Sequence, residues 1–271
     1  SFSTRVSDLK TDSGSFSTRV SDSNLYLSGS GTIISGSSVS TGSFGHIKLG
    51  TADIGGVHKI SLSNNDAGTS NTIFGKDAGL SLDAGSNYNV FIGEDVSDAA
   101  MNDAVENVGV GYQALSGLTT GDRNTVIGYQ AGIAVNTGTN NTIIGRTAGT
   151  TATTSSGSVF IGDGAGEGVS TGNRNIAIGQ NAMVATTTGD NNVAIGAFAG
   201  DALTSGFSNV IIGKNAGGQI TTAKQNVIIG EGAYASANTS ENFGVAIGFN
   251  AATLLDGIDN VVAIGHSALS T

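Results

Sequence analysis

The most regular feature of the chain is a mostly apolar triplet that is closed by glycine and recurs at a fixed interval. The glycine returns every 17 or 18 residues, and the residue three positions later is Ala in every copy except the second, which has Val96. A fixed period of this kind is typical of a repeat architecture in which each unit stacks on the next. The glycines are Gly75, Gly93, Gly111, Gly128, Gly145, Gly162, Gly179, Gly196, Gly213, Gly230, Gly248 and Gly265.

Each repeat has room for two short strands and two turns. The triplet predicts a strongly apolar strand, Gly-Xaa-Xaa-Ala a turn, the residues after it a second and weaker strand, and Thr-Gly-Xaa-Xaa-Asn a second turn. We therefore predict an all-β fold, a parallel β-solenoid or β-roll of about twelve flattened, two-sided coils of 17–18 residues. At about 4.8 Å per coil, the array would be roughly 58 Å long.

The triplet does not alternate between apolar and polar residues, as a strand with one solvated face would. Two neighbouring columns are both apolar although they point to opposite faces, so both faces are predicted to be buried. One can fill the coil, and the other would form an apolar stripe along which chains associate, with three chains favoured. One column contains Ile127, Ile144, Ile161, Ile178, Ile195, Ile212, Ile229 and Ile247. The other contains Val126, Ile143, Phe160, Ala177, Ala194, Ile211, Ile228 and Ala246.

A further column carries asparagine four residues before the glycine in nine copies. Stacked coils would place these side-chain amides one above another, where each can serve the next as donor and acceptor. We therefore predict an Asn ladder along the array. Its members are Asn71, Asn89, Asn107, Asn124, Asn141, Asn175, Asn192, Asn209 and Asn226.

We place the repeat array at residues 67–271. Two other regions precede it. Residues 1–27 contain the octet SFSTRVSD twice, and apolar residues or Ser recur there in alternating steps of four and three. This spacing predicts a weak coiled-coil stalk, and the alternative is a strand-forming or flexible linker. Residues 28–66 are rich in Gly and Ser with short apolar runs, and are predicted to be a β transition region.

Composition narrows the classes of function. The net charge of −10 argues against nucleic acid as a partner, and the lack of any run of 18 apolar residues argues against membrane insertion. There is no Cys, the three His are scattered, and Asp and Glu stand singly in turns. We therefore expect no catalytic site, no metal site and no cofactor.

Pairs of Thr or Ser, such as Thr119-Thr120 and Thr187-Thr188, stand nine and eight residues before several of the glycines. We interpret them as hydroxyls that cap the turns. Because flat rows of Thr can order water, a secreted ice-binding solenoid remains an alternative.

The unit Asn-Xaa-Xaa-Ile-Gly-Xaa-Xaa-Ala, as at 192–199, resembles the repeat of trimeric autotransporter adhesin heads. That family forms trimeric left-handed parallel β-rolls from a shorter repeat. The copies at 110–115 and 127–132, and the stretch 34–45, look like segments of phage tail-fibre proteins.

The resemblance to tail fibres implies a shaft or spacer of a homotrimeric virion fibre that supports attachment to the host surface. Its partners would be further copies of itself and neighbouring fibre or virion proteins, and regions outside this segment would contact a host glycan or protein. The first alternative is the head of a trimeric adhesin on the bacterial cell surface.

Overall fold

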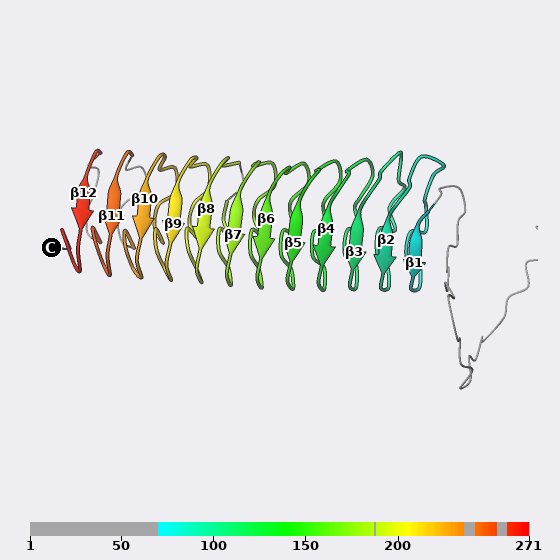
Figure 1. Cartoon of the computed structure of the whole chain (residues 1–271), viewed down its shortest axis with the longest axis horizontal. Coiled ribbons are helices and arrows are strands. Elements are labelled where there is room, and N and C mark those ends of the chain that lie inside the picture. The colour runs from blue at the N-terminus through cyan, green and yellow to red at the C-terminus, as the bar shows by residue number, and fades with distance from the viewer. Residues whose placement is uncertain (1–69, 187, 236–241, 254–258, 271) are drawn as a thin grey trace, which may run out of the picture. The chain divides into compact units, whose positions relative to one another are not determined.

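A computed structural model of the chain describes residues 70–186, 188–235, 242–253 and 259–270. These residues contain twelve β-strands of three residues, one in each repeat, and no helix. The strands form one parallel sheet in chain order (Figure 1). The predicted all-β, parallel β-solenoid is therefore confirmed. The strands are β1 (Thr72–Phe74), β2 (Val90–Ile92), β3 (Val108–Val110), β4 (Thr125–Ile127), β5 (Thr142–Ile144), β6 (Val159–Ile161), β7 (Ile176–Ile178), β8 (Val193–Ile195), β9 (Val210–Ile212), β10 (Val227–Ile229), β11 (Val245–Ile247) and β12 (Val262–Ile264).

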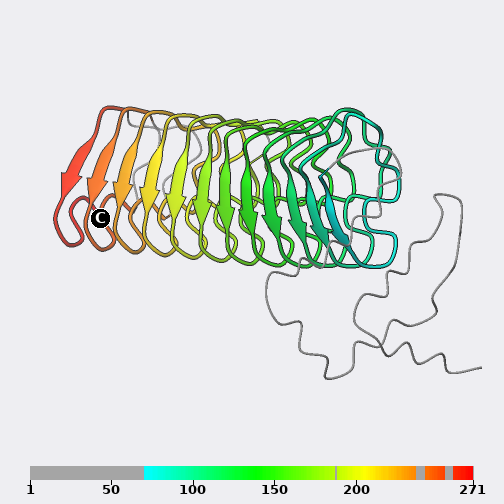
Figure 2. The same ribbon diagram turned by 45° about the vertical axis from the view of Figure 1, so that its right-hand side comes forward.

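The register of the sheet keeps equivalent residues of successive repeats level with one another. Val126 pairs with Ile143 and Ile127 with Ile144, and the same relation holds between every pair of neighbouring strands described, even where the spacing is 18 residues. We number the coils after the strand that each contains, from coil 1 to coil 12. Figure 2 shows the strands on one face of the stack, with the turns of each coil behind them.

The glycine that ends each strand is required by the close approach of neighbouring coils. Gly128 has a φ of 144°, and a Cβ at this position would lie 2.3 Å from the carbonyl oxygen of Gly145. Only glycine has both the conformational freedom and the space for this corner. The glycine column therefore fixes where each strand stops.

The second strand that we expected in each coil is absent from the described residues, so that part of the prediction is wrong. After the strand glycine the chain makes consecutive turns, with left-handed residues such as Gln130 and Gly132, both at a φ of 52°. Neighbouring coils still exchange backbone hydrogen bonds here, as from Gly132 N to Ala148 O at 2.9 Å. Left-handed residues interrupt extended backbone, so this side is a stack of turns.

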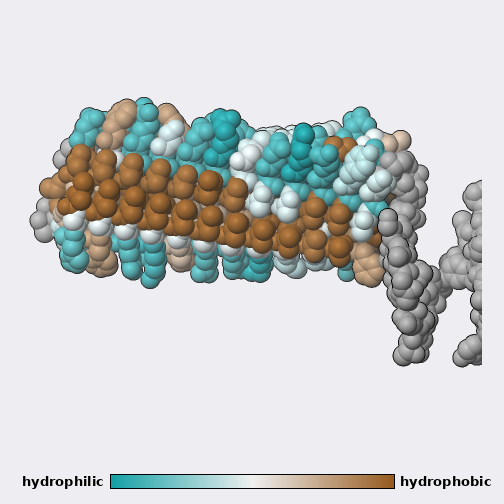
Figure 3. Space-filling model, viewed as in Figure 1, coloured by the Kyte–Doolittle hydropathy of each residue, from teal (hydrophilic) through white to brown (hydrophobic). Residues whose placement is uncertain are grey.

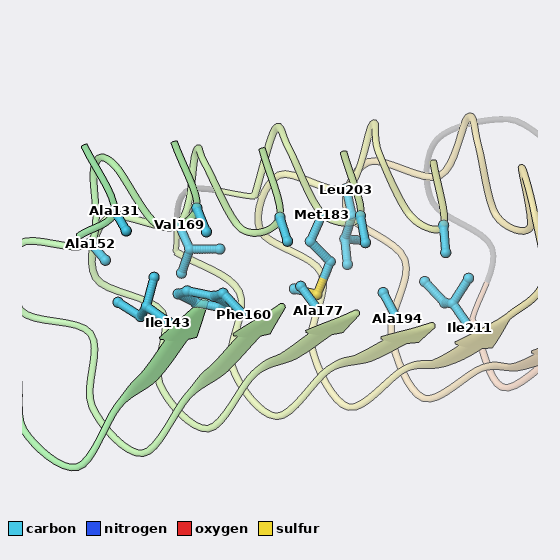
Figure 4. Packing of buried hydrophobic residues seen from close by; sticks show 14 of the residues in the cluster. Ala131, Ile143, Ala152, Phe160, Val169, Ala177, Met183, Ala194, Leu203 and Ile211 are labelled. Atoms are coloured by element: carbon cyan, nitrogen blue, oxygen red, sulfur yellow. The ribbon is translucent and has the colours of Figure 1, made fainter. Parts of the chain in front are cut away.

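The core is a thin column between the strands and the turns (Figure 4). The middle residue of each strand points inward, and the fourth residue after the strand glycine lies on the opposite side of the same space, where six coils have glycine. The two vary in opposite directions in several coils: Phe160 lies against Gly166, where a Cβ would be 2.5 Å from the ring, and Ala177 is matched by Met183. Side chains of complementary size keep a narrow interior filled without voids.

The predicted stalk at 1–27 and transition region at 28–66 lie outside the described residues. Their boundaries, and that of the array at residue 67, stay predictions.

Candidate functional site

The outer face of the sheet carries a continuous apolar surface, which we call the stripe. It consists of the first and third residues of every strand, because the middle residue points into the coil, as in the partly exposed, buried, exposed pattern of β4. Figure 3 shows the stripe as a brown band along the strands. Its first-position column is Thr72, Val90, Val108, Thr125, Thr142, Val159, Ile176, Val193, Val210, Val227, Val245 and Val262. Its third-position column is Phe74, Ile92, Val110, Ile127, Ile144, Ile161, Ile178, Ile195, Ile212, Ile229, Ile247 and Ile264.

The structure separates the two predicted apolar columns. One is buried within its own chain, at zero exposure for Val126, Ile143, Phe160, Ala177, Ala194, Ile211, Ile228 and Ala246. The other points outward, and Ile127 and Ile195 are 39% and 36% exposed. The remaining third-position isoleucines from Ile144 to Ile247 are half-buried by their neighbours in the column.

Sequence reasoning missed the first-position column as part of this surface. Residues two apart in a strand point to the same side, so Val193 accompanies Ile195 and Val210 accompanies Ile212. That signal was present in the sequence. The stripe is therefore two columns wide instead of one, although its first-position column has Thr in coils 1, 4 and 5.

The two columns of the stripe differ in size. The third position is Ile in ten of the twelve strands, and the first position is Val in eight and Thr in three. Ten of the twelve coils thus present a larger side chain after a smaller one along the strand, whereas coil 3 has Val at both positions and coil 7 has Ile at both.

Two rows of side chains border the stripe (Figure 3). The Gly-side row contains the residue that follows each strand glycine, from Lys76 to His266, and the Asn-side row contains the residue two before each strand, from Ser70 to Asn260.

Side chains along the Gly-side row pair between coils. The pairs are Lys76 with Glu94 at 3.0 Å, the stacked rings of Tyr112 and Tyr129 at 5.4 Å, Arg146 with Asp163 at 2.8 Å, Lys214 with Glu231 at 3.9 Å, and the stacked rings of Phe249 and His266 at 5.2 Å. Exposed ion pairs of this kind add little stability, so these pairs mainly define the border of the stripe.

The asparagine column is buried just inside the sheet and forms hydrogen bonds along the stack. Asn192 Nδ2 donates to Asn175 Oδ1 at 3.2 Å and to Gly206 O at 2.9 Å, while its own Oδ1 accepts the backbone N–H and the Nδ2 of Asn209, both at 3.0 Å. Asn124, Asn141 and Asn209 bond in the same way, and the Nδ2 of Asn175 donates to Gly189 O. Asn226 Nδ2 donates to Asn209 Oδ1 at 3.1 Å.

Serine takes the place of asparagine in coil 6, and the hydrogen bonds are reorganised there. Ser158 Oγ accepts the backbone N–H of Asn175 at 3.2 Å, and Ser155 Oγ donates to Gly172 O at 2.6 Å. The two serine hydroxyls are 3.1 Å apart. Two serines thus serve the backbone groups that one asparagine serves elsewhere.

A second polar ladder, which sequence reasoning missed, runs through the turn two residues before the asparagine column. Asp122 Oδ1 accepts the N–H of Val105 at 2.9 Å, and Asp190 Oδ1 accepts that of Asn173 at 2.6 Å. The corresponding sequence signal is Asp, Asn or Ser at the second residue after the Thr of the turn, because these residues readily accept backbone hydrogen bonds.

In several Thr/Ser pairs, the hydroxyl of the first residue donates a hydrogen bond to the next coil. Thr153 Oγ1 donates to Ser170 O at 3.1 Å, and Thr204 Oγ1 donates to Thr221 O at 3.0 Å. Thr119 Oγ1 donates to Asn136 Oδ1 at 2.6 Å. These contacts match the capping interpretation.

Titration of a few side chains is perturbed by local surroundings. Burial raises the pKa of Asp201, whose Oδ1 is buried without a hydrogen-bond partner. The hydroxyl and backbone N–H of Ser86 hold the pKa of Asp83 below its ordinary value, and hydrogen bonding to Glu94 raises the pKa of Lys76.

Within the described ranges, no group of three or more His, Cys, Asp or Glu could hold a metal ion. The same part of the chain contains no helix able to cross a membrane.

Comparison with protein-family models, with curated proteins and with solved structures finds no match to this chain. The stripe and its borders are therefore the basis on which function is inferred.

Proposed function

We propose that the array is a mechanical element, a shaft or spacer of a homotrimeric virion fibre that supports attachment to a host surface. The observation that carries the proposal is the stripe, which runs the length of the sheet on the outer face (Figure 3). Apolar columns that are exposed in a single chain are stabilised when another surface covers them. Further copies of the chain are the partners that match a stripe of the same length and period.

The size of the surface suits such an association. Eleven steps of about 4.8 Å give a stripe roughly 53 Å long, and two columns make it roughly 10 Å wide, so its flat area is roughly 500 Å². That is already near the largest apolar patch of a typical monomer. With both border rows the face is roughly 20 Å wide and offers roughly 1,000 Å². A trimer shares this face between two neighbours, so each interface buries roughly 500 Å² per side, or roughly 1,000 Å² in total, which reaches the lower bound for a specific interface.

The difference between the two columns favours parallel rods. If neighbouring copies are related by rotation about the rod direction, the third-position column of one faces the first-position column of the next. Ile then meets Val or Thr at nearly every level. If the rods are antiparallel, Ile meets Ile on one side and Val meets Val on the other, which opens a wedge. Large against small is the better-packed arrangement.

Three chains are proposed because the repeat resembles that of trimeric adhesin heads, and a narrow stripe can face a threefold axis. The resemblance of 110–115 and 127–132 to tail-fibre segments supports placing the rod on a virion. In this assembly the rod is stiffened by backbone hydrogen bonds along its axis and by the covered stripe. Neighbouring fibre or virion proteins would join at its ends, and host recognition would lie in other regions.

The alternative that shares this geometry is the head of a trimeric bacterial surface adhesin. Immunogold labelling with an antibody against the array separates the two. Label on particle fibres supports the shaft, whereas label on the surface of uninfected cells supports the adhesin. Ice binding is not favoured, because the first hydroxyls of pairs such as Thr153 and Thr204 are used to cap backbone carbonyls.

The decisive experiment is the native mass of the chain in solution. We expect about three times the chain mass of 26.8 kDa. Ile195→Asp should reduce the mass to that of one chain, because a carboxylate would be buried in the stripe. Thr171→Asp, in an exposed turn, is the matched control and should remain trimeric. A monomeric parent protein, or an Ile195→Asp variant that still assembles, would overturn the proposal.

A further inference from the structure

The stripe brings copies together, but over coils 6 to 12 it cannot fix their position along the rod. From coil 6 to coil 12 every third-position residue is Ile, and every first-position residue except Ile176 is Val. Over these seven coils, a neighbour displaced by one coil would therefore meet nearly the same side chains and lose the contacts of only one coil. This argument rests on the proposed self-association, and it asks what sets the register within it.

Register matters because of closure. Copies related by a pure rotation lie at equal height and form a closed ring. Copies that are staggered by a coil are related by a screw, which leaves an open assembly that can keep growing. A fibre of fixed length therefore needs a contact between residues that have no equivalent in the neighbouring coils, so that it forms in one register only.

Coil 11 carries such a feature. It is the only coil of the described array with an aromatic residue in both border rows, Phe243 in the Asn-side row and Phe249 in the Gly-side row. Their exposed fractions are 49% and 46%. The ring of Phe249 stacks on His266, which holds it at the border of the stripe.

We propose that these two residues set the register, with Phe243 of one copy packed against Phe249 of the next. Rotation about the rod direction brings the Asn-side row of one copy to the Gly-side row of its neighbour. The two residues are six apart in one coil, so their heights differ by roughly 1.7 Å, a third of a coil step.

A displacement of one coil breaks this contact. Phe243 would then face Glu231 or His266, and Phe249 would face Gln225 or Asn260. Displacement in the first direction leaves Phe243 against the Glu231 carboxylate and Phe249 against the Asn260 amide, and both polar groups must lose water. Displacement in the other direction leaves Phe243 with the ring of His266, so only Phe249 loses an aromatic partner. Coil 11 thus opposes mainly the first displacement, while the stripe supplies contact area along the whole rod.

Disulfide trapping tests the inference, because the chain has no cysteine of its own. One variant, Val227→Cys with Ile229→Cys, places thiols at the same level in neighbouring copies. A second, Val227→Cys with Ile212→Cys, places them one coil apart and reports staggered copies. Bonding requires Cβ atoms within about 4.5 Å, so each pair reports one register. Covalent trimers are read on a non-reducing gel after mild oxidation, and native mass is measured on the same samples.

We expect the level pair to link and the staggered pair to remain largely unlinked. Adding Phe249→Ser should lower the yield of the level pair at least threefold and raise that of the staggered pair, with the native mass kept or increased. Phe249→Tyr keeps the ring and should restore the level pair. Phe207→Ser is the matched control, since Phe207 is 43% exposed but lies in neither border row.

The outcomes separate the two proposals. A monomeric parent with no linked species overturns self-association. A trimeric parent whose level pair links equally with and without Phe249 overturns the register inference and leaves self-association intact. A Phe249→Ser variant that is folded by far-UV circular dichroism but monomeric also overturns it, because the ring would then drive assembly instead of alignment.

Discussion

The contribution of the asparagine column to stability can be tested at Asn192, which is fully buried and has asparagine on both sides in the stack. Asn192→Ala removes four hydrogen bonds, two donated to Asn175 Oδ1 and Gly206 O, and two accepted from Asn209. The backbone N–H of Asn209 and one of its amide protons would be left buried without acceptors.

The expected loss follows from these contacts. Four hydrogen bonds at about 0.5–1.5 kcal/mol each give about 2–6 kcal/mol, and the unsatisfied donors move the value to the upper half, so we expect about 4 kcal/mol. Asn192→Ser keeps an acceptor for the N–H of Asn209, as Ser158 does for Asn175. It should therefore cost about half as much, about 2 kcal/mol.

The assay is chemical unfolding followed by far-UV circular dichroism at one fixed chain concentration, because association shifts apparent stability. Thr171→Ala, on an exposed turn, is the control and should stay within about 0.5 kcal/mol of the parent. Hydrogen exchange at the amide of Asn209 gives a local measurement and should become faster. If Asn192→Ala unfolds like the control and this amide remains protected, the ladder is not a source of stability and the reasoning is refuted.

Three further predictions concern the core, the corner glycines and pH. Phe160→Ala should lower the free energy of unfolding by about 3–5 kcal/mol, measured by calorimetry or denaturant unfolding. Adding Gly166→Met should recover part of this loss, because Ala177 and Met183 pack this way in coil 7. No recovery would refute the pairing of sizes. Gly145→Ala should lower the free energy of unfolding by about 3 kcal/mol or more, since its φ is 140° and its Cβ would lie 2.2 Å from Gly162 O. Gly157→Ala, whose Cβ would have its nearest neighbour at 3.5 Å, should cost only about 1 kcal/mol. Equal losses would contradict the steric argument. The raised pKa of Asp201 means that the folded state binds its proton more tightly than the unfolded chain, so stability falls as pH rises from the ordinary Asp pKa through the folded one. Asp201→Asn should therefore raise the melting temperature at pH 7 and lose this advantage near pH 3, and an equal shift at both would exclude the carboxylate as the cause.

The fold could be predicted from the sequence because the repeat is strict and each column keeps its chemistry. Which apolar column faces inward was harder, since both are apolar. A parity argument would have settled it: Asn192 and Ala194 are two apart and share a side, so a ladder of buried amides places Ala194 inside and Ile195 outside.

The turn side was less predictable. Gly132, Gly149 and Gly166 in the expected second strand are signals for left-handed backbone, and they argue against a strand. In contrast, the positive φ of Thr147 and Phe198 has no clear local signal, because such residues seldom adopt it alone and the stacking of coils imposes it here. The matching of Phe160 with Gly166 likewise depends on two segments meeting across the interior.

Each strand pairs only with its neighbours in the sequence, so the number of coils can change without altering the contacts of the other coils. Insertion or deletion of one whole coil would change the length by about 4.8 Å and leave the inner column, the asparagine column and the stripe in phase. A part-coil insertion must instead be absorbed in a turn, as the 18-residue spacing between Gly93 and Gly111 already is, with β2 and β3 still in register. Duplication of one repeat in the gene can therefore lengthen the rod by one coil while the stripe keeps its composition.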